Sequence, residues 1–499
     1  MRAGTGVRRL VSVALFSWSL MGLAGGARAA DEEREEAAAA APPEAETPAE
    51  TEKSPPPEPA LSKPAPLKTP PPAEPKPSPT GIQLIELNGW KISMDGRLNS
   101  FIVYGFGNHN AASAPETGNT IVGGIGTGIS ADNQVNTSGN FATPRIRSGF
   151  LPNVLAFNFT KSFGESTVLS GRLAIWAEVE SNLRAEITPQ IYAQEGWLKL
   201  EGGWGSLTVG RQLALFNRGA IEIDFNYGHG FGVGWPCNFN GEGPACGQIG
   251  YGALFPFFRP GFVYATPVLS GLQVTVGAFD PAMLPGKWER VITPTFQGEV
   301  AFTQPLPGLG MFKLFANGLW QRLGGQANFV DPTPANPNPP ADASTLANQT
   351  VDQWGVAGGF RFEAGPLRLG GTAHYGPGLG FNYAQENSPS AYYNAAVATD
   401  PNNGKLRTYR GLYAQAALVF GPVMIAGGVG VSQLLKLSFD DVSLNPMPKQ
   451  NLGINGVFNY HINENLVWDL DWFRSQSSWY GTAFAQTVNV VSSGFTLLF

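Results

Sequence analysis

Few side chains in this chain of 499 residues have the types and spacing that catalysis requires. A general base must lie within hydrogen-bond reach of the group that it activates. The four histidines fall in four separate segments, with no nucleophile motif beside them: His109, His229, His374 and His461. The glycine-rich stretches 123–128 and 228–234 are not followed by a helical pattern, as a phosphate-binding loop would be. We therefore expect neither an enzyme nor a cofactor.

Charged side chains instead occupy alternate positions within short apolar segments. Trp468, Leu470 and Trp472 share one side of a segment whose other side carries Asp469 and Asp471. Period-two alternation places successive side chains on opposite faces of a strand. The same reasoning turns five basic side chains toward a wet interior: Arg97, Arg172, Lys313, Arg361 and Arg368.

The end of the chain shows this alternation in its simplest form. Phe495, Leu497 and Phe499 share one side, while Gly494 and Thr496 share the other. Such a strand suits a sheet between lipid and water, and an outer-membrane β-barrel requires this repeat. Past the N-terminus, no stretch reaches the roughly 18 uninterrupted apolar residues that a membrane-spanning helix requires. A closed barrel is the other way for a chain to cross a bilayer.

Sixteen candidate strands follow residue 89, and short and long connections alternate between them. The short connections are 162–166, 201–205, 267–271, 304–310, 365–366, 421–422 and 461–465. The long ones are 108–146, 181–190, 213–258, 281–294, 323–352, 376–406, 434–449 and 475–487. We predict an all-β fold: a 16-stranded antiparallel transmembrane β-barrel with short periplasmic turns and long outer loops. A barrel of about this size leaves an aqueous channel.

The N-terminal part has a different composition. Residues 1–29 begin with Arg2, Arg8 and Arg9, continue with an apolar run, and end on small residues, as a secretory signal peptide does. Residues 30–88 are rich in Ala, Pro and Glu, which predicts a disordered periplasmic linker. The barrel domain is then 89–499, and export predicts a location in the cell outer membrane.

Cys237 and Cys246 are the only cysteines. Because the periplasm is oxidising, we expect a disulfide between them. It would close a loop of about ten residues and stabilise the protein by roughly 2 to 3 kcal/mol. Two alternatives stay open, namely a pair of free thiols and a metal site with His229, although we predict no metal.

Several segments resemble the general, trimeric porins of Gram-negative bacteria. They are DGRLN at 95–99, WLKLEGGWGSLTVGRQ at 197–212, RPGFVYATPVLSGLQVTVGAFD at 259–280, and the terminal Phe499. The Pro-Glu-Phe-Gly-Gly run of that family is missing from the third outer loop, 213–258, where Glu-Ile-Asp-Phe stands at 222–225 instead. The resemblance covers scattered parts of about 410 residues and implies the barrel more strongly than any individual site residue.

The resemblance implies that the third outer loop folds into the lumen and narrows it. The constriction would then place the acids Glu222, Asp224 and Glu242 opposite Arg97 and Arg172. Charged rings bias the choice of ions in a pore. The alternative is that these charges only solvate a wet lumen. The resemblance also implies a homotrimer in outer-membrane lipid, and recognition of Phe499 by the barrel assembly machinery.

The implied function is passive diffusion of small hydrophilic solutes and ions. A porin selective for a sugar or an anion is one alternative, since Phe101, Trp176, Phe315 and Phe473 are expected to point inward. A second alternative is a porin whose Pro-rich segment also contacts peptidoglycan. The mild net charge of −6 argues against a nucleic-acid partner. A barrel lipase would need a paired Ser and His, which no motif suggests.

Overall fold

The computed structural model describes most of the chain beyond residue 80. The described residues are 81–108, 140–164, 166–179, 191–225, 247–282, 288, 290–325, 349–382, 384–385, 406–437, 447–481 and 485–499. Contacts divide the chain into Met1–Lys68, which lies outside the described residues, and Thr69–Phe499, which contains the fold. Among the described residues, no helix is long and apolar enough to span a membrane.

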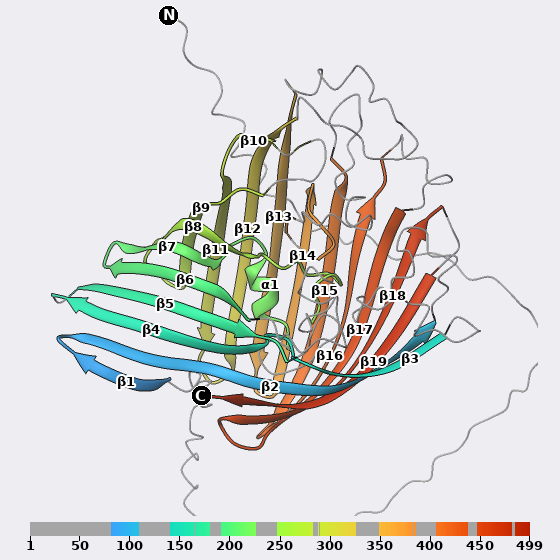
Figure 1. The fold of residues 1–499 in the computed structure, drawn as a ribbon, viewed down its shortest axis with the longest axis horizontal. Coiled ribbons are helices and arrows are strands. Elements are labelled where there is room, and N and C mark those ends of the chain that lie inside the picture. The colour runs from blue at the N-terminus through green and yellow to red at the C-terminus, as the bar shows by residue number, and fades with distance from the viewer. Residues whose placement is uncertain are drawn as a thin grey trace, which may run out of the picture. The chain divides into compact units, whose positions relative to one another are not determined.

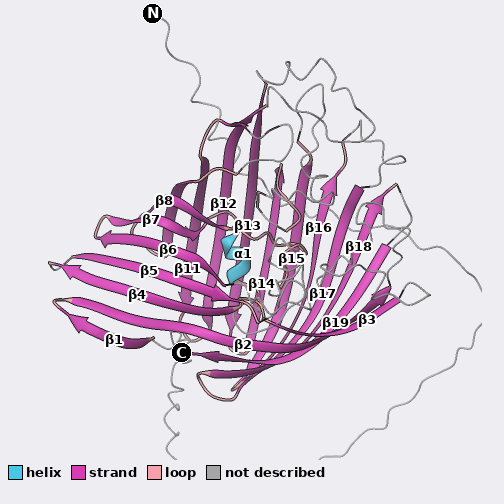
Figure 2. Ribbon diagram, viewed as in Figure 1, coloured by secondary structure: helices cyan, strands magenta, loops and turns pink. Residues whose placement is uncertain are grey.

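Nearly all described elements are strands, with one short helix (Figure 2). The first half comprises β1 (Ile82–Leu87), β2 (Trp90–Asn108), β3 (Asn140–Arg147), β4 (Asn153–Phe163), β5 (Thr167–Ala177), β6 (Ile191–Gly202), β7 (Gly205–Leu213), α1 (Arg218–Glu222), β8 (Phe258–Ala265) and β9 (Leu272–Phe279). The second half comprises β10 (Arg290–Val291), β11 (Thr295–Leu306), β12 (Gly310–Gly324), β13 (Thr350–Ala364), β14 (Leu367–Pro377), β15 (Thr408–Phe420), β16 (Val423–Leu435), β17 (Met447–His461), β18 (Leu466–Tyr480) and β19 (Ala485–Leu498).

The strands form one closed antiparallel sheet (Figure 1). Most strands pair with the next strand in the chain, β9 pairs with β11, and β19 returns to pair with β2. Three of the nineteen strands add no position to the ring. β1 only extends the pairing at the start of β2, and β10 only that at the end of β12. β3 and β4 pair with successive parts of β2 and together occupy one position. The described part is therefore the predicted 16-stranded antiparallel barrel.

The closing seam depends on the end of the chain. The backbone of Phe499 exchanges two hydrogen bonds with Gly96, with N–O distances of 2.9 and 3.1 Å. Full closure satisfies the backbone groups that a sheet edge would otherwise leave exposed.

Two features differ from the sequence prediction. The linker was expected to extend to residue 88, but Ile82–Leu87 forms β1, which pairs with the start of β2 through a turn at Asn88 and Gly89. The second barrel position was expected to begin after residue 146, but it already begins at Asn140 and is interrupted between β3 and β4.

The interruption has a local cause. Pro152 has no N–H to donate to a ladder, and Leu151 adopts a φ of 69°. Asn99 on β2 closes the gap with its side chain: its Oδ1 accepts from Gly149 N at 2.8 Å, and its Nδ2 donates to Leu151 O at 2.8 Å. A single buried amide thus replaces ladder hydrogen bonds at this point.

The two faces of the sheet differ as the alternation predicts. Leu412, Ile425 and Phe495 are more than half exposed on the outer face, whereas Asp469 is fully buried on the inner face. Apolar side chains also fill part of the interior, where inward-folded connections meet the wall. This cluster contains Phe216, Leu254, Trp288, Leu319, Leu323, Val351, Leu379, Phe381, Leu406, Tyr409, Leu434 and Trp479.

Candidate pore constriction

The described parts of the connection between β7 and β8, residues 214–225 and 247–257, lie against the inner wall of the barrel. The bounds of this connection agree with the predicted third outer loop, and α1 within it lies against β13 (Figure 1). Inward-facing amides of the wall bind its backbone. Gln297 Oε1 on β11 accepts from Leu215 N and Phe216 N, both at 2.8 Å. Asn317 Oδ1 on β12 accepts from Asn217 N at 3.1 Å.

The approach of α1 to the wall is close because residue 219 is glycine. A Cβ there would lie 2.7 Å from the Phe315 ring on β12. Any larger side chain would push the helix away from the wall. The residue type therefore fixes how far α1 stands from β12.

The later part of the loop crosses to β15 and β16. Gln415 Oε1 accepts from Phe225 N at 2.9 Å, and Ser432 Oγ accepts from Gly252 N at 2.8 Å. Gly252 has a φ of 101°, and a Cβ there would lie 2.3 Å from Leu412 O. The described parts of the loop are thus bound to β11, β12, β15 and β16, which fixes them inside the barrel.

Asp224 has a different place from the one predicted. It was expected to line the constriction, but its side chain is 5% exposed. Its Oδ2 accepts from Gln248 N at 2.8 Å, and its Oδ1 accepts from Gln415 Nε2 at 3.2 Å. The carboxylate therefore joins the part of the loop around residue 224 to the part around Gln248, and both to Gln415 on the wall, and it does not face the lumen.

Glu222 does meet basic side chains, but not those predicted. Lys313 Nζ on β12 donates to Glu222 Oε2 at 2.7 Å, and Arg361 Nη1 on β13 donates to the carbonyl of Glu222 at 3.3 Å. Arg361 also pairs with Glu363 at 2.7 Å, and Arg368 on β14 lies 3.9 Å from Glu363. We name these residues the loop-three charge cluster: Glu222, Lys313, Arg361, Glu363 and Arg368.

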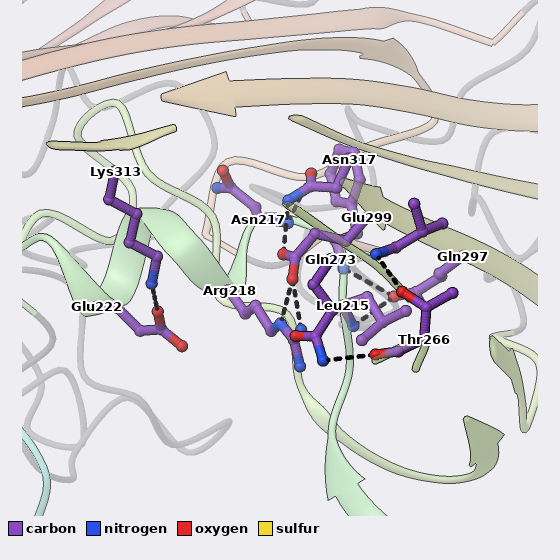
Figure 3. A network of polar contacts seen from close by, with 12 residues as sticks. Leu215, Asn217, Arg218, Glu222, Thr266, Gln273, Gln297, Glu299, Lys313 and Asn317 are labelled. Carbon is purple, nitrogen blue, oxygen red and sulfur yellow. Dashed lines mark hydrogen bonds and ion pairs between the residues drawn. The ribbon is translucent and has the colours of Figure 1, made fainter. Parts of the chain in front are cut away.

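A second ion pair lies on the other side of α1. Figure 3 shows Arg218 turned toward Glu299 while Glu222 meets Lys313. Arg218 Nε donates to Glu299 Oε1 at 3.0 Å, and Asn317 Nδ2 donates to Glu299 Oε2 at 3.4 Å. Glu299 is 6% exposed, so this pair fixes α1 to the wall. Strand parity turned Glu299 inward, but no sequence signal identified Arg218 as its partner.

Arg172 belongs to a separate cluster, on β2, β4, β5 and β6. It binds Asp95 at 2.8 Å, Asn158 Oδ1 at 2.9 Å and Glu195 at 3.3 Å. We name Asp95, Arg172 and Glu195 the β5 charge cluster. In the order of strands around the ring, β12–β14 lie about half-way round from it. Arg172 therefore faces the loop-three charge cluster from the opposite wall.

Arg97 points to the same face as Asp95, two residues along β2. It pairs in register with Leu498, close to the end of the chain. None of the hydrogen bonds between described residues joins Arg97 or Arg172 to Glu222. The residues predicted to form one constriction are thus divided between two walls of the barrel.

Three predicted site residues lie outside the described residues: Glu242, Cys237 and Cys246. Their roles as a constriction acid and a disulfide stay predictions. Asp469 and Asp471 are on the inner face of β18 as predicted, with exposures of 0% and 3%. Among the described residues, no group of three or more His, Cys, Asp or Glu is placed to hold a metal ion.

Comparison with known proteins adds evidence on the fold. No protein-family model matches the chain, and no curated protein matches it in sequence. The outer membrane channel DcaP of Acinetobacter baumannii superposes with a TM-score of 0.57 at 13% identity, covering 84% of this chain and all of that one. The chain has a porin fold. An anion-selective porin from Comamonas acidovorans gives a TM-score of 0.51 at 11% identity, covering 82% of this chain and all of that one.

The porin fold accounts for the elements described above. Both similar structures are matched over their full length, so the whole barrel corresponds and not one sheet of it. At these identities the likeness concerns the fold alone. The residues of the two charge clusters must therefore be interpreted from their own contacts.

Proposed function

We propose that this protein is an outer-membrane porin, a water-filled channel for passive diffusion of small hydrophilic solutes and ions. The observation that carries the proposal is a closed 16-stranded barrel with a loop fixed to its inner wall beside ionised side chains. A porin interior is polar while its outer band is apolar. The charges lining the narrowest part then bias which solutes pass.

The exposed charges suggest where solutes pass. In the loop-three charge cluster, Lys313 is 27%, Arg368 29% and Glu222 43% exposed. In the β5 charge cluster, Arg172 is 21% and Asp95 31% exposed. The path that we propose runs between these two clusters, across the barrel from β12–β14 to β2–β6.

The balance of charge favours anions weakly over cations. The loop-three charge cluster contains three bases and two acids, and the β5 charge cluster contains two acids and one base, with Arg97 as a second base beside it. An excess of one positive charge beside the loop would raise the local concentration of anions. This observation keeps an anion-preferring pore as the second candidate.

A sugar-selective pore receives less support. Such a pore would need exposed aromatic rings along the path, but the predicted aromatics are covered. Phe101, Trp176, Phe315 and Phe473 are 1%, 6%, 5% and 0% exposed. Trp176, for example, packs edge-on against Phe258 with ring centroids 5.3 Å apart.

Uptake into proteoliposomes tests the proposal. Liposomes containing the refolded protein should swell in small uncharged sugars at rates that fall smoothly with solute size. Saturable uptake of one solute class would instead favour a selective pore. No swelling above protein-free liposomes would contradict the channel itself.

The remaining parts of the proposal rest on the sequence. Residues 1–29 act as a signal peptide, the following Pro-rich residues as a periplasmic spacer, with contact to peptidoglycan as their alternative role, and Phe499 as the signal for the barrel assembly machinery. The protein assembles as a homotrimer in outer-membrane lipid. Chemical cross-linking in mild detergent, followed by electrophoresis, would distinguish a trimer from a monomer.

A further inference from the structure

A group of basic side chains lies at one end of β15–β17, which are neighbours in the sheet (Figure 1). Arg410 on β15 is paired in register with Tyr375 on β14, which is 43% exposed on the outer face. Arg410 is itself exposed, so it faces away from the lumen. Lys436, directly after β16, and Lys449 on β17 are exposed as well. We name Arg410, Lys436 and Lys449 the outer basic group.

Two glutamines fix the position of Arg410. Register aligns Arg410 with Gln433 on β16, and Gln433 with Gln450 on β17. Arg410 Nε donates to Gln433 Oε1 at 2.8 Å, and Gln433 Nε2 donates to Gln450 Oε1 at 2.6 Å. Because Gln433 is the one described residue that accepts from Arg410, both Nη nitrogens stay available as donors. A guanidinium with free parallel donors matches the oxygens of a phosphate group.

A shift in strand pairing brings Lys449 to the same part of the surface. The pairing of β17 with β18 skips Lys449, which is therefore an extra residue in its strand. Its Nζ lies 5.6 Å from the centre of the Tyr480 ring. Tyr480 has the parity of Trp472, which is 39% exposed on the outer face of β18. The Tyr480 hydroxyl donates to Leu434 O at 3.1 Å, so Lys449 lies near the end of β16, where Lys436 follows.

The outer basic group lies where the apolar part of the outer face ends. The next outward-facing row toward the middle of the barrel consists of Leu412, Val431 and Leu452, which are paired in register. Tyr375, beside Arg410, belongs to a row of aromatic side chains, with Trp354 at 6.0 Å between ring centroids. Such rows mark the membrane interfaces of a barrel. The short turn 421–422 lies at the opposite ends of β15 and β16, and short turns are periplasmic, so this interface belongs to the outer leaflet.

No acidic side chain of the described outer face offsets these bases. Strands β14–β19 contain two acids, Asp469 and Asp471, and both are on the inner face. None of the ion pairs between described residues includes the outer basic group. Arg474, further down the outer face of β18, adds a fourth base. Asp440 and Asp441 belong to the connection 438–446, outside the described residues. The described face is therefore positively charged at the level of lipid head groups.

We propose that the outer basic group binds the phosphate head group of an anionic lipid in the outer leaflet. Arg410 binds the phosphate oxygens through its two Nη nitrogens, and the lysines supply further positive charge. β15 and β17 are two strand spacings, or about 10 Å, apart, so a phosphate above Gln433 is within reach of both Arg410 and Lys449. The apolar row beneath contacts the acyl chains. The site lies outside the barrel and is independent of the solute that the channel carries.

Native mass spectrometry of the full chain, refolded in an uncharged detergent, tests the site. The anionic probe is dioleoylphosphatidic acid, and the zwitterionic one is dioleoylphosphatidylcholine. We expect saturable binding of phosphatidic acid, tighter than that of phosphatidylcholine by at least about fivefold. Arg410→Gln and Lys449→Gln should each weaken it about fivefold, and the double variant about twentyfold, since each base near a membrane surface contributes about that factor. Inorganic phosphate should not displace the lipid, because it lacks acyl chains.

Arg322→Gln is the matched control. Arg322 also faces outward at the outer end of its strand, β12, but its Nε and Nη2 donate to Asp352 at 2.8 and 2.9 Å. Its donors are occupied and its charge is offset, so this variant should bind phosphatidic acid as the wild type does.

Two further measurements separate the lipid site from folding and from the channel. The shift between heated and unheated samples in electrophoresis verifies that each variant has closed its barrel, and single-channel conductance should be unchanged in all of them. Equal affinity of the wild type for the two lipids would overturn the proposal. Unchanged binding by the folded double variant, or displacement of the lipid by inorganic phosphate, would overturn it too.

Discussion

At the scale of single residues, the account depends on which charged side chains face each other inside the barrel. Parity along the strands correctly turned Lys313, Arg361 and Arg368 inward, but it did not indicate that Glu222 would meet the first two. That contact depends on the path of residues 214–222 away from β7, which no periodicity encodes. The arrangement places a basic excess beside the loop, where the sequence had predicted the acids of the loop opposite Arg97 and Arg172.

Removing one charge beside the loop should change ion selectivity. Lys313→Ala leaves Glu222 without its 2.7 Å partner, so the reversal potential in a KCl gradient should move toward cations. Glu222→Gln should move it in the opposite direction. Both changes in reversal potential are expected because the side chains of Lys313 and Glu222 are partly exposed inside the barrel.

Arg322→Ala provides the control for this experiment. It removes the same charge from β12, but Arg322 is an exposed residue paired with Asp352 and has the outward parity of Trp320. Its reversal potential should equal that of the wild type. An equal shift in Lys313→Ala and Arg322→Ala would contradict the proposed path.

The β5 charge cluster should affect stability as well as selectivity. Arg172→Met leaves Asp95 and Glu195 close together without their shared base, which should cost about 1–3 kcal/mol after allowance for partial exposure. Urea unfolding in lipid vesicles, followed by tryptophan fluorescence, measures the change. Arg410→Met is the comparison, because exposed Arg410 donates only to Gln433. Equal stability of both variants would show that the cluster contributes nothing.

At the scale of elements, the wall amides explain why the loop lies inside the barrel. Gln297 lies on the inner face of β11 and satisfies two backbone N–H groups that would otherwise be buried without partners. Asn317 and Gln415 each accept from one further backbone N–H along the loop, that of Asn217 and that of Phe225. The loop is therefore an integral part of the wall's hydrogen bonding.

Gln297→Leu should release the start of the loop. Two buried N–H groups would lose their acceptor, at about 1–3 kcal/mol each, so the loop should detach and the single-channel current should become larger or noisier. Gln304→Leu is the control on the same strand, since Gln304 is exposed and binds only Pro305 O. A quiet channel of unchanged conductance in Gln297→Leu would mean that other contacts hold the loop.

The strands were largely predictable from the sequence, whereas the loop contacts were not. Side-chain period and short turns such as Gly365-Pro366 identify a barrel strand without knowledge of its neighbours. The gap between β3 and β4 was missed because it depends on Asn99, some 50 residues away in the chain. Asp224 was misplaced for the same reason, since its partner Gln415 is 191 residues distant.

At the scale of the whole molecule, the N-terminal extension and the barrel are separate in composition. Only the final residues of the predicted linker join the sheet, as β1. The ring closes between β2 and β19 and does not require residues before Ile82. The channel should therefore be independent of the Pro-rich segment.

Deletion of residues 31–79 should leave the conductance of the purified channel unchanged. If the segment also contacts peptidoglycan, cells with the deletion should release more outer-membrane vesicles, and less of the protein should co-sediment with peptidoglycan. A deletion that abolishes conductance in correctly folded protein would contradict this separation. Replacement of the segment by a Gly/Ser linker of equal length controls for spacing.

Single-channel recording of the wild-type protein in a planar lipid bilayer tests the central claim most directly. A water-filled barrel narrowed by a fixed loop predicts discrete current steps whose conductance rises in proportion to salt concentration. Correctly folded protein that inserts into the bilayer and yields no steps, or a conductance that saturates at low salt, would contradict it.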